Sequence, residues 1–392
     1  MKKLLFLFAS VLFISCGKSL FKQNQQTIKF KRTEKHLKIK LKPENYDKGN
    51  FCFDTGCAWL VFTDRYYEQQ KMSFENTYNS AMGGVGNDEA QTLRVLDTIH
   101  FAIDKHHFYS EFNIVLHLAQ KVTKNIDGIV GFHNFRGIPF KIDYVKQRII
   151  LNPEVTNDYQ EIKIKFDGYE MLLPMEITLA DGKTIQGNFI IDTGSGTSTL
   201  TNQFVNNDVI KKVKKANYES NGGIGGKSDG SVFFVPQIKI DKYNLSTRLI
   251  EVAKDTLGAL ATDESYIGIV GNDILDDFDI IYKPTEYKIW MKPNKNFNNQ
   301  IEVLFKGFVV LEVPDLNQGW IVSNIYKESD AYKKGLRYND EIVAINGKSV
   351  HKMNRDKFMR KLKPNQKLQL KVKRGNDFVE INTYLNTFLK KE

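Results

Sequence analysis

Cysteine, proline and tryptophan are scarce in this chain of 392 residues, which contains three, nine and three of them. Two of the cysteines, Cys52 and Cys57, flank a tight turn that a disulfide would constrain, so we predict two free, buried thiols there. The seven histidines are scattered without the spacing of zinc ligands. We therefore expect no metal site and no cofactor.

Arginine-rich runs and zinc-finger spacings are absent as well. The formal charge is +10, but the lysines that produce it are dispersed along the chain. A dispersed excess of this kind indicates a solvated surface, so we expect no nucleic-acid partner. The stretch "NGGIGGKS", Asn221 to Ser228, is one residue short of a phosphate-binding loop and lacks the flanking strand and helix, so we expect no nucleotide site.

Long hydrophobic runs are missing except at the N-terminus. There, Lys2 and Lys3 precede an apolar stretch from Leu4 to Ile14, which is too short to span a bilayer comfortably and has the layout of a secretory signal. Cys16 follows a small residue at the end of this stretch, which resembles the lipobox of bacterial lipoproteins. That resemblance implies cleavage before Cys16 and lipidation of its thiol.

The expected product is an exported lipoprotein of a bacterial cell envelope, anchored to the membrane by its lipid alone and facing the periplasm. Residues 1–15 are then the signal peptide and residues 16–27 a tether. A plain signal peptide that contains a chance cysteine is the alternative interpretation.

An internal repeat dominates the rest of the chain. "FCFDTGCAWLVF" at 51–62 matches "FIIDTGSGTSTL" at 189–200, and four further segments match downstream at offsets of 137 to 140 residues. Landmarks that keep their order and spacing indicate a duplicated unit of roughly 130 residues, the size of a small domain. Both copies consist of short alternating or β-branched runs, which predict a mainly β fold.

Each copy ends an apolar run with Asp-Thr-Gly. A carboxylate in such a place is costly unless it is used or well hydrogen-bonded. If the two copies face each other, Asp54 and Asp192 meet and share one proton, since two adjacent carboxylates cannot both ionise. Such a pair activates water for hydrolysis of an amide without a metal.

These motifs resemble those of the aspartic peptidases, with retropepsin-like and pepsin-like folds, over about residues 28–291. The resemblance implies two similar β-barrel lobes, at 28–155 and 156–293, that form a pepsin-like cleft. It assigns catalysis to Asp54 and Asp192. It assigns support of this dyad to the rest of each turn, which comprises Thr55, Gly56, Cys57, Thr193, Gly194 and Ser195. It assigns glycine-rich flap tips to both copies, namely Gly83, Gly84, Val85, Gly86, Gly222, Gly223, Ile224, Gly225 and Gly226.

One departure from the family lies beside the first aspartate. Cys57 stands where the second copy has Ser195, and a thiol is a weaker hydrogen-bond donor than a hydroxyl. A hydroxyl bonded to the carboxylate would lower its pKa, so we expect Asp192 to ionise more readily than Asp54. A fold that keeps both turns but has lost activity is the alternative.

The C-terminal region follows a polar, asparagine-rich linker at 292–300 and resembles a PDZ domain over residues 301–392. Ser329 opens a short helix, and Asn346-Gly347 forms a hairpin turn. The resemblance places the loop that binds a peptide carboxylate at Gly307, Phe308 and Val309. The domain either binds the C-terminus of a peptide there or only packs on the lobes.

Two functions follow from these resemblances. The first is an exported aspartic endopeptidase that cleaves peptide or protein substrates and carries a PDZ module. The second is a non-catalytic lipoprotein that binds peptides as a sensor or adaptor on the same scaffold.

Overall fold

The computed structural model describes residues 26–33, 35–117, 126–135, 137–299, 303–312 and 319–391. The predicted signal peptide and Cys16 lie outside these ranges. The described residues are mainly β, as the sequence predicted, with short helices between strands. None of the helices described is long and apolar enough to cross a membrane.

The first copy of the repeat forms a ten-stranded sheet in which β4 (Gly49–Asp54) lies between β3 (His36–Pro43) and β11 (Gly128–Gly131). Alternating buried and exposed side chains along β3 give one face to the core, as period-two patterning requires. The remaining elements are β2 (Lys31–Thr33), β5 (Leu60–Thr63), α1 (Asp64–Gln69), β6 (Thr77–Met82), β7 (Ala90–Val95), β8 (Ile99–Ile103), β9 (His106–Ser110) and β10 (Asn113–His117).

The second copy repeats this arrangement in a larger sheet. β17 (Thr184–Ile191) pairs in parallel with β22 (Gly268–Val270), as β4 pairs with β11. An added pairing of β16 (Met171–Thr178) with β20 (Gly226–Ile240) closes this sheet into a barrel-like ring. The other elements are β15 (Lys165–Phe166), β18 (Thr199–Leu200), α2 (Asp208–Lys212), β19 (Lys215–Gly223), β21 (Tyr243–Ala253) and α3 (Asn272–Leu275).

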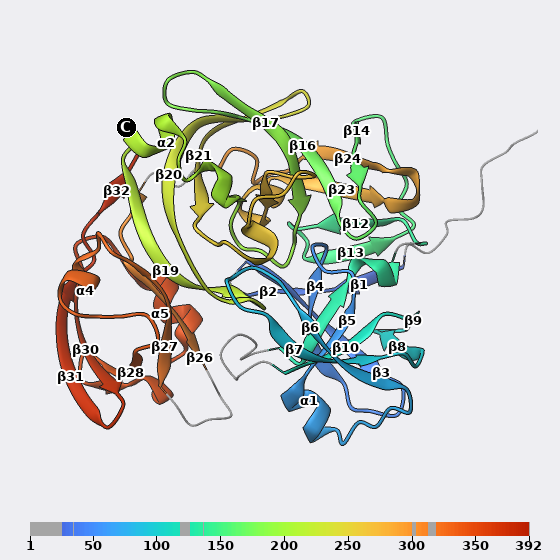
Figure 1. Ribbon diagram of the computed structural model, residues 1–392, viewed down its shortest axis with the longest axis horizontal. Helices are drawn as coiled ribbons and strands as arrows, with labels where there is room; N and C mark the ends of the chain where they lie inside the picture. Colours follow the sequence, from blue (N-terminus) through green and yellow to red (C-terminus); the bar gives the residue numbers. More distant parts are fainter. Residues whose placement is uncertain are drawn as a thin grey trace, which may run out of the picture.

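A six-stranded sheet joins the two copies, on the right of Figure 1. Its central strands, β12 (Phe140–Asp143) and β23 (Phe278–Lys283), are antiparallel, with Ile142 opposite Ile280. These isoleucines are equivalent positions of the repeat, so an approximate two-fold axis passes between them. The outer strands are β1 (Thr27–Lys29), β13 (Arg148–Leu151), β14 (Gln160–Lys163) and β24 (Lys288–Pro293).

The C-terminal module has a hydrophobic core of its own, separate from the core that the two copies of the repeat share. Trp320 and Phe308 are the largest side chains buried in it. Its elements are β25 (Val303–Leu304), β26 (Phe308–Glu312), β27 (Trp320–Tyr326), α4 (Asp330–Lys333), β28 (Glu341–Ile345), β29 (Lys348–Ser349), α5 (Arg355–Lys361), β30 (Lys367–Arg374), β31 (Asp377–Tyr384) and β32 (Leu389–Lys390). As predicted, Ser329 caps α4, and Asn346-Gly347 joins β28 to β29.

The module is joined to the second copy by strand pairing. β27 runs antiparallel to β19, with Glu219 opposite Ile325, so one sheet continues from the repeat into the module. The Glu328 carboxylate adds two hydrogen bonds, from the backbone N–H and the side-chain amide of Asn217, at 2.7 and 2.8 Å. Figure 1 shows the module at the left, alongside β19.

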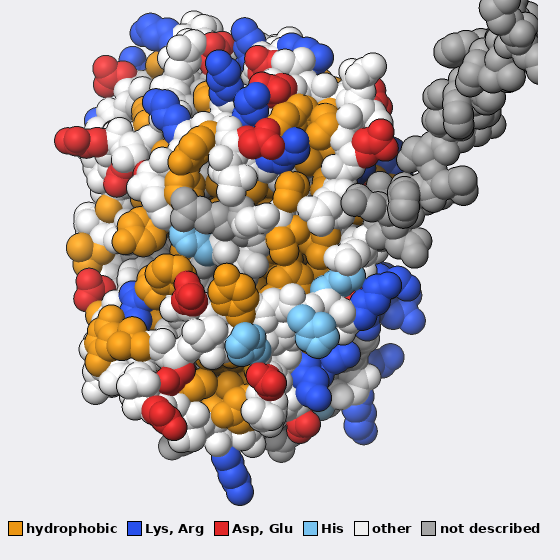
Figure 2. Space-filling model, turned by 90° about the vertical axis from the view of Figure 1, so that its right-hand side faces the viewer, with side chains coloured by type: hydrophobic (Ala, Val, Ile, Leu, Met, Phe, Trp, Pro, Cys, Tyr) orange, Lys and Arg blue, Asp and Glu red, His pale blue; other side chains and the backbone are white. Residues whose placement is uncertain are grey.

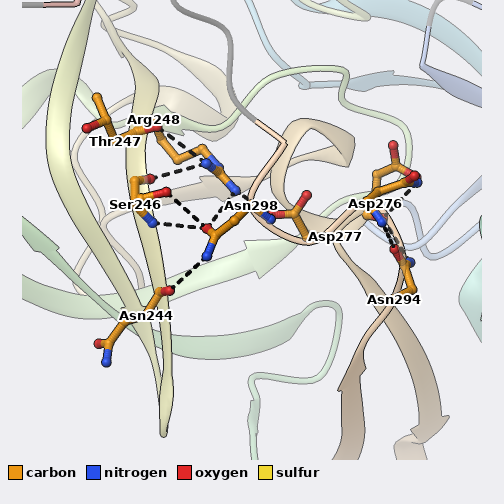
Figure 3. Close-up of polar contacts among 9 residues, drawn as sticks. Asn244, Ser246, Thr247, Arg248, Asp276, Asp277, Asn294 and Asn298 are labelled. Atoms are coloured by element: carbon orange, nitrogen blue, oxygen red, sulfur yellow. Dashed lines mark hydrogen bonds and ion pairs between the residues drawn. The ribbon is translucent and has the colours of Figure 1, made fainter.

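The asparagine-rich segment after β24 is fastened to the second copy. Asn298 accepts hydrogen bonds from Ser246 and Arg248 on β21, and Asn294 donates to the carbonyl of Asp276 (Figure 3). The Arg248 guanidinium also forms a buried ion pair with Asp277 at 2.5 Å. The described part of the predicted linker is therefore fixed by its asparagine side chains.

Charged side chains are mixed on the face drawn in Figure 2, where lysines and arginines alternate with acidic and apolar groups. In the six-stranded sheet, lysines form ion pairs across neighbouring strands, such as Lys141 with Asp279 and Lys288 with Glu161. This mixture agrees with the solvated surface that the dispersed sequence charge indicated.

Candidate active site

The two Asp-Thr-Gly turns lie at equivalent strand ends. Asp54 is the last residue of β4, and Asp192 directly follows β17. Each turn is packed against a glycine that ends or follows the neighbouring parallel strand, Gly131 in the first copy and Gly271 in the second. A Cβ on either glycine would lie within 2.4 Å of a carbonyl oxygen of the turn segment, which leaves no room for another residue.

The two turns are locked together by their threonines. The Thr55 N–H donates to Thr193 Oγ1, and the Thr193 N–H donates to Thr55 Oγ1, both at 3.0 Å. Each hydroxyl in turn donates across the two-fold axis, Thr55 to the carbonyl of Ile191 at 2.6 Å and Thr193 to that of Phe53 at 3.0 Å. Both threonines are fully buried. These four bonds fix the relative position of the two turns.

The lock brings the Asp54 and Asp192 carboxyl groups side by side, close enough to share a hydrogen bond. The glycines make this approach possible, because a Cβ on Gly194 would lie 2.2 Å from Asp54 Oδ2, and one on Gly56 would lie 2.7 Å from Asp192 Cγ. Gly56 donates to Asp54 Oδ1 at 2.9 Å, and Gly194 donates to Asp192 Oδ1 at 2.7 Å.

The electrostatics of the pair are unequal. Burial, then the charge of Asp192, then the hydrogen bond to Asp192 raise the pKa of Asp54 well above its ordinary value. Burial also raises the pKa of Asp192, but hydrogen bonds from Asp54, Gly194 and Ser195 oppose the increase. A carboxyl group whose pKa is raised keeps its proton at higher pH. The two adjacent carboxyl groups therefore favour retention of a proton between them.

The expected role of the Ser195 hydroxyl is wrong. Its oxygen donates to the carbonyl of Thr197 at 2.7 Å, and its backbone N–H is the group that donates to Asp192, at 3.0 Å. The Cys57 thiol likewise points to the carbonyl of Trp59, at 3.8 Å. The difference between thiol and hydroxyl thus does not act on the carboxylates directly. Cys52 and Cys57 are both free and buried, which confirms that prediction.

A further layer of polar groups supports the second turn. Asn272, fully buried at the start of α3, donates to the carbonyl oxygens of Thr193 and Ser195 at 2.7 and 3.0 Å. Tyr144 from the first copy donates to Asn272 Oδ1 at 2.8 Å. The His36 side chain bonds the backbone of Gly194, and burial lowers the pKa of this histidine to about 4. The second turn is therefore held by residues of both copies.

The predicted flap tips connect the strands of two hairpins, which we call the first hairpin (β6–β7) and the second hairpin (β19–β20). The two differ in length, because residues 83–89 join the strands of the first and Ile224-Gly225 those of the second. Their tips are bonded to each other: Gly225 donates to the carbonyl of Val85 at 3.0 Å, and Asp88 donates to that of Gly225 at 2.8 Å.

The tips also exchange apolar side chains. Ile224 of the second hairpin packs on a cluster of the first copy that includes Cys57, Ile114 and Ile129. Val85 of the first hairpin packs on a cluster of the second copy. The remaining tip glycines also lie at this crossing. In the first hairpin, Gly83 approaches Gly258, Gly84 approaches Ile224, and Gly86 approaches Gly225. In the second hairpin, Gly222 and Gly223 face Val85, and Gly226 approaches Asp88.

The loop expected to bind a carboxylate lies at the start of β26. Gly307 has a positive φ of 65°, and the N–H of Phe308 donates to the carbonyl of Lys306 at 2.6 Å. Val309 is exposed. In the described residues β26 pairs only with β27, and the buried Arg355 of α5 donates to the carbonyl of Val310 at 2.9 Å. A strand added on the α5 side of β26 must therefore displace this guanidinium.

Several polar residues of the second copy lie near the site but have no polar counterpart in the first copy, and the alignment of the two copies did not identify them. Glu251 occupies the position of Ile114 in the first copy, and burial followed by the charge of Asp273 raises its pKa to about 7. It lines a cavity of about 410 Å³ that also reaches Tyr326 of the C-terminal module. Asp255 is another such residue. The sequence signal that could have identified these residues is a charged residue in one copy aligned with an apolar residue in the other.

A comparison with protein families matches residues 300–373 to the PDZ domain. The C-terminal module is therefore a PDZ domain, as its sequence motifs predicted, and PDZ domains bind peptides or protein partners. A comparison of the chain with curated proteins gave no match.

Proposed function

We propose that this protein is an aspartic endopeptidase, in which Asp54 and Asp192 hydrolyse a peptide bond held beneath the two hairpin tips. The observation that carries the proposal is the pairing of two adjacent carboxyl groups between two interlocked Asp-Thr-Gly turns. Such a pair places a proton donor and a proton acceptor side by side, and amide hydrolysis requires both. Mainly β copies joined about an approximate two-fold axis agree with the resemblance to aspartic peptidases.

In this mechanism the ionised Asp192 takes a proton from a water molecule, and the water oxygen attacks the substrate carbonyl. The protonated Asp54 donates its hydrogen to the carbonyl oxygen as the tetrahedral intermediate forms. As that intermediate collapses, the C–N bond breaks, Asp192 gives its proton to the leaving amine, and a hydroxyl proton of the intermediate returns to Asp54, which restores the singly protonated pair. The N–H groups of Gly56, Gly194 and Ser195 keep both carboxyl groups in place during these transfers.

The experiment is a cleavage assay on a mixture of unstructured peptides between pH 3 and pH 8, with products identified by mass spectrometry. We expect Asp54→Asn and Asp192→Asn to lower the cleavage rate by at least about 100-fold, since each removes a group that transfers a proton. Asp181→Asn, on an exposed turn where Asp181 pairs with Lys183, is the matched control and should cleave like the wild type. Equal activity of wild type and Asp192→Asn would refute the proposal.

A peptide-binding protein without catalysis is the second candidate, favoured by the tips that are already bonded to each other. It predicts that wild type and Asp192→Asn bind the same peptides and that neither cleaves them.

For the PDZ domain we propose that an extended peptide adds to β26 and displaces Arg355. Arg355→Ala should then strengthen peptide binding, whereas a domain that only packs on the second copy would bind peptide in neither form.

We also propose that the protein is exported and anchored to a bacterial cell envelope through lipid on Cys16. The proposal rests on the N-terminal sequence, in which an apolar stretch ends at Ser15-Cys16-Gly17. Metabolic labelling with a radioactive fatty acid tests it. We expect Cys16→Ser to abolish the labelling, and labelling of that variant would count against the assignment.

A further inference from the structure

Asp255 connects the tips of both hairpins although it belongs to neither. It lies just after β21 and is fully buried. Its carboxylate accepts hydrogen bonds from the backbone N–H of Gly86 at 3.1 Å and from the side-chain amide of Asn87 at 3.0 Å, both in the first hairpin. It also accepts from the Ser228 hydroxyl of the second hairpin, with both oxygens at 2.9 Å. One carboxylate therefore holds two separate segments.

The loop that carries Asp255 adds backbone contacts of its own. Thr256 donates to Asn87 Oδ1 at 2.8 Å, and Ala259 donates to the carbonyl of Gly84 at 3.1 Å. A Cβ on Gly258 would lie 2.0 Å from that same carbonyl oxygen, so the loop and the first tip are in direct contact. The first tip is thus clasped between the second hairpin on one side and the Asp255 loop on the other.

The sequence of the first copy contains no counterpart of Asp255. With an offset of 137 to 140 residues, the segment equivalent to Asp255 is "VLHL", residues 115–118, and neither it nor residues 119–125 contain an aspartate or glutamate. The duplicated sequence therefore does not require this residue. A buried carboxylate costs free energy unless its hydrogen bonds compensate, and here all the described donors come from the two hairpins and the adjoining backbone.

We propose that Asp255 is a positioning residue that latches the two hairpin tips in the closed arrangement. The tips are crossed, with Val85 and Ile224 on the opposite copies, so a polypeptide enters the site only after they separate. Separation removes the bonds from Gly86 and Asn87 to Asp255, and closure over the substrate restores them. Asp255 thus sets the balance between open and closed tips. The role in catalysis rests on the proposed peptidase function, whereas the latch itself does not.

Hydrogen exchange measured by mass spectrometry on the full chain without substrate tests the latch. In Asp255→Asn we expect the amides of Gly86 and Gly225 to exchange at least about tenfold faster, since a charge-assisted bond is lost. The amides of Thr55 and Thr193 should exchange as in the wild type. Asn87→Ala, on a half-buried loop position, keeps the Asp255 carboxylate but removes its bond from Asn87 and the acceptor of the Thr256 N–H, and should speed the same exchange.

Asp229→Asn is the matched control, because this nearby carboxylate pairs with Lys227 and bonds neither Gly86 nor Asn87. Unchanged exchange at Gly86 and Gly225 in both latch variants overturns the proposal. Faster exchange that extends equally to Thr55 and Thr193 also overturns it, since the role is then general stability. If cleavage is detectable, Asp255→Asn should lower kcat without altering the shape of the pH profile, which reports on the dyad. A latch without any cleavage contradicts the peptidase proposal alone.

Discussion

The interlocked threonines allow a quantitative prediction for Thr55→Val, which keeps the size of the side chain and removes its hydroxyl. Two buried groups then lose their partner, namely the N–H of Thr193 at 3.0 Å and the carbonyl of Ile191 at 2.6 Å. An unsatisfied buried polar group costs about 1–3 kcal/mol. We therefore expect the free energy of unfolding to fall by about 2–6 kcal/mol.

Thr201→Val is the control for the same chemical change. Thr201 is also fully buried, but its hydroxyl makes a single long contact of 3.4 Å to the carbonyl of Ile267, which already accepts the Thr201 N–H at 3.0 Å. The expected loss is below about 1 kcal/mol, since no group is left without a partner.

The assay is urea-induced unfolding, monitored through hydrogen exchange of the peptides that cover β4 and β17. Exchange of defined segments is needed because the chain has separate cores, and a single global signal would mix their transitions. If Thr55→Val is within about 0.5 kcal/mol of Thr201→Val, the four bonds across the two-fold axis do not hold the turns together, and the reasoning fails.

Two other predictions concern buried charges. The unfolded Glu251 ionises near its ordinary pKa of 4.5 and the folded one near 7, so stability falls as pH rises between these values. The free energy of unfolding of Glu251→Gln, relative to that of the wild type, should therefore rise by about 3 kcal/mol between pH 4 and pH 8. A difference that does not change with pH in urea titrations would contradict this. Arg248→Met should lose about 3–5 kcal/mol, because Asp277 stays buried without its partner. Lys183→Met breaks an exposed ion pair and should unfold at the same urea concentration as the wild type. If Lys183→Met and Arg248→Met lose equal stability, burial of the ion pair is not the cause of the loss.

Much of the fold could be predicted from local sequence. Strand β3 alternates in hydrophobicity, and the two Asp-Thr-Gly motifs gave the positions of both carboxyl groups that the structure brings together. The PDZ domain was predictable because its turn and cap residues occur at fixed spacing. These features share a physical basis, since each depends on residues close together in the chain.

The contacts that the sequence did not predict are long-range and one-sided. β19 pairs with β27 over three residues, which is too short to leave a pattern in either strand. Asp255 has no repeated partner, so the duplication that located Asp54 was no guide to it. The hydroxyl of Ser195 was misassigned for a similar reason, because a choice between a carboxylate and a carbonyl acceptor depends on the exact path of the turn.

The pairing of β19 with β27 has a consequence for any attempt to study the two parts separately. An unpaired strand edge is a template for association with other chains. Cutting the chain before β25 would leave this edge of β19 unpaired, including the Asn217 carbonyl that accepts from Lys327, and would also remove the packing of Leu389 on Ala216. We therefore expect a truncated protein to self-associate through β19, so that a loss of activity in it would report aggregation rather than a regulatory role of the missing domain.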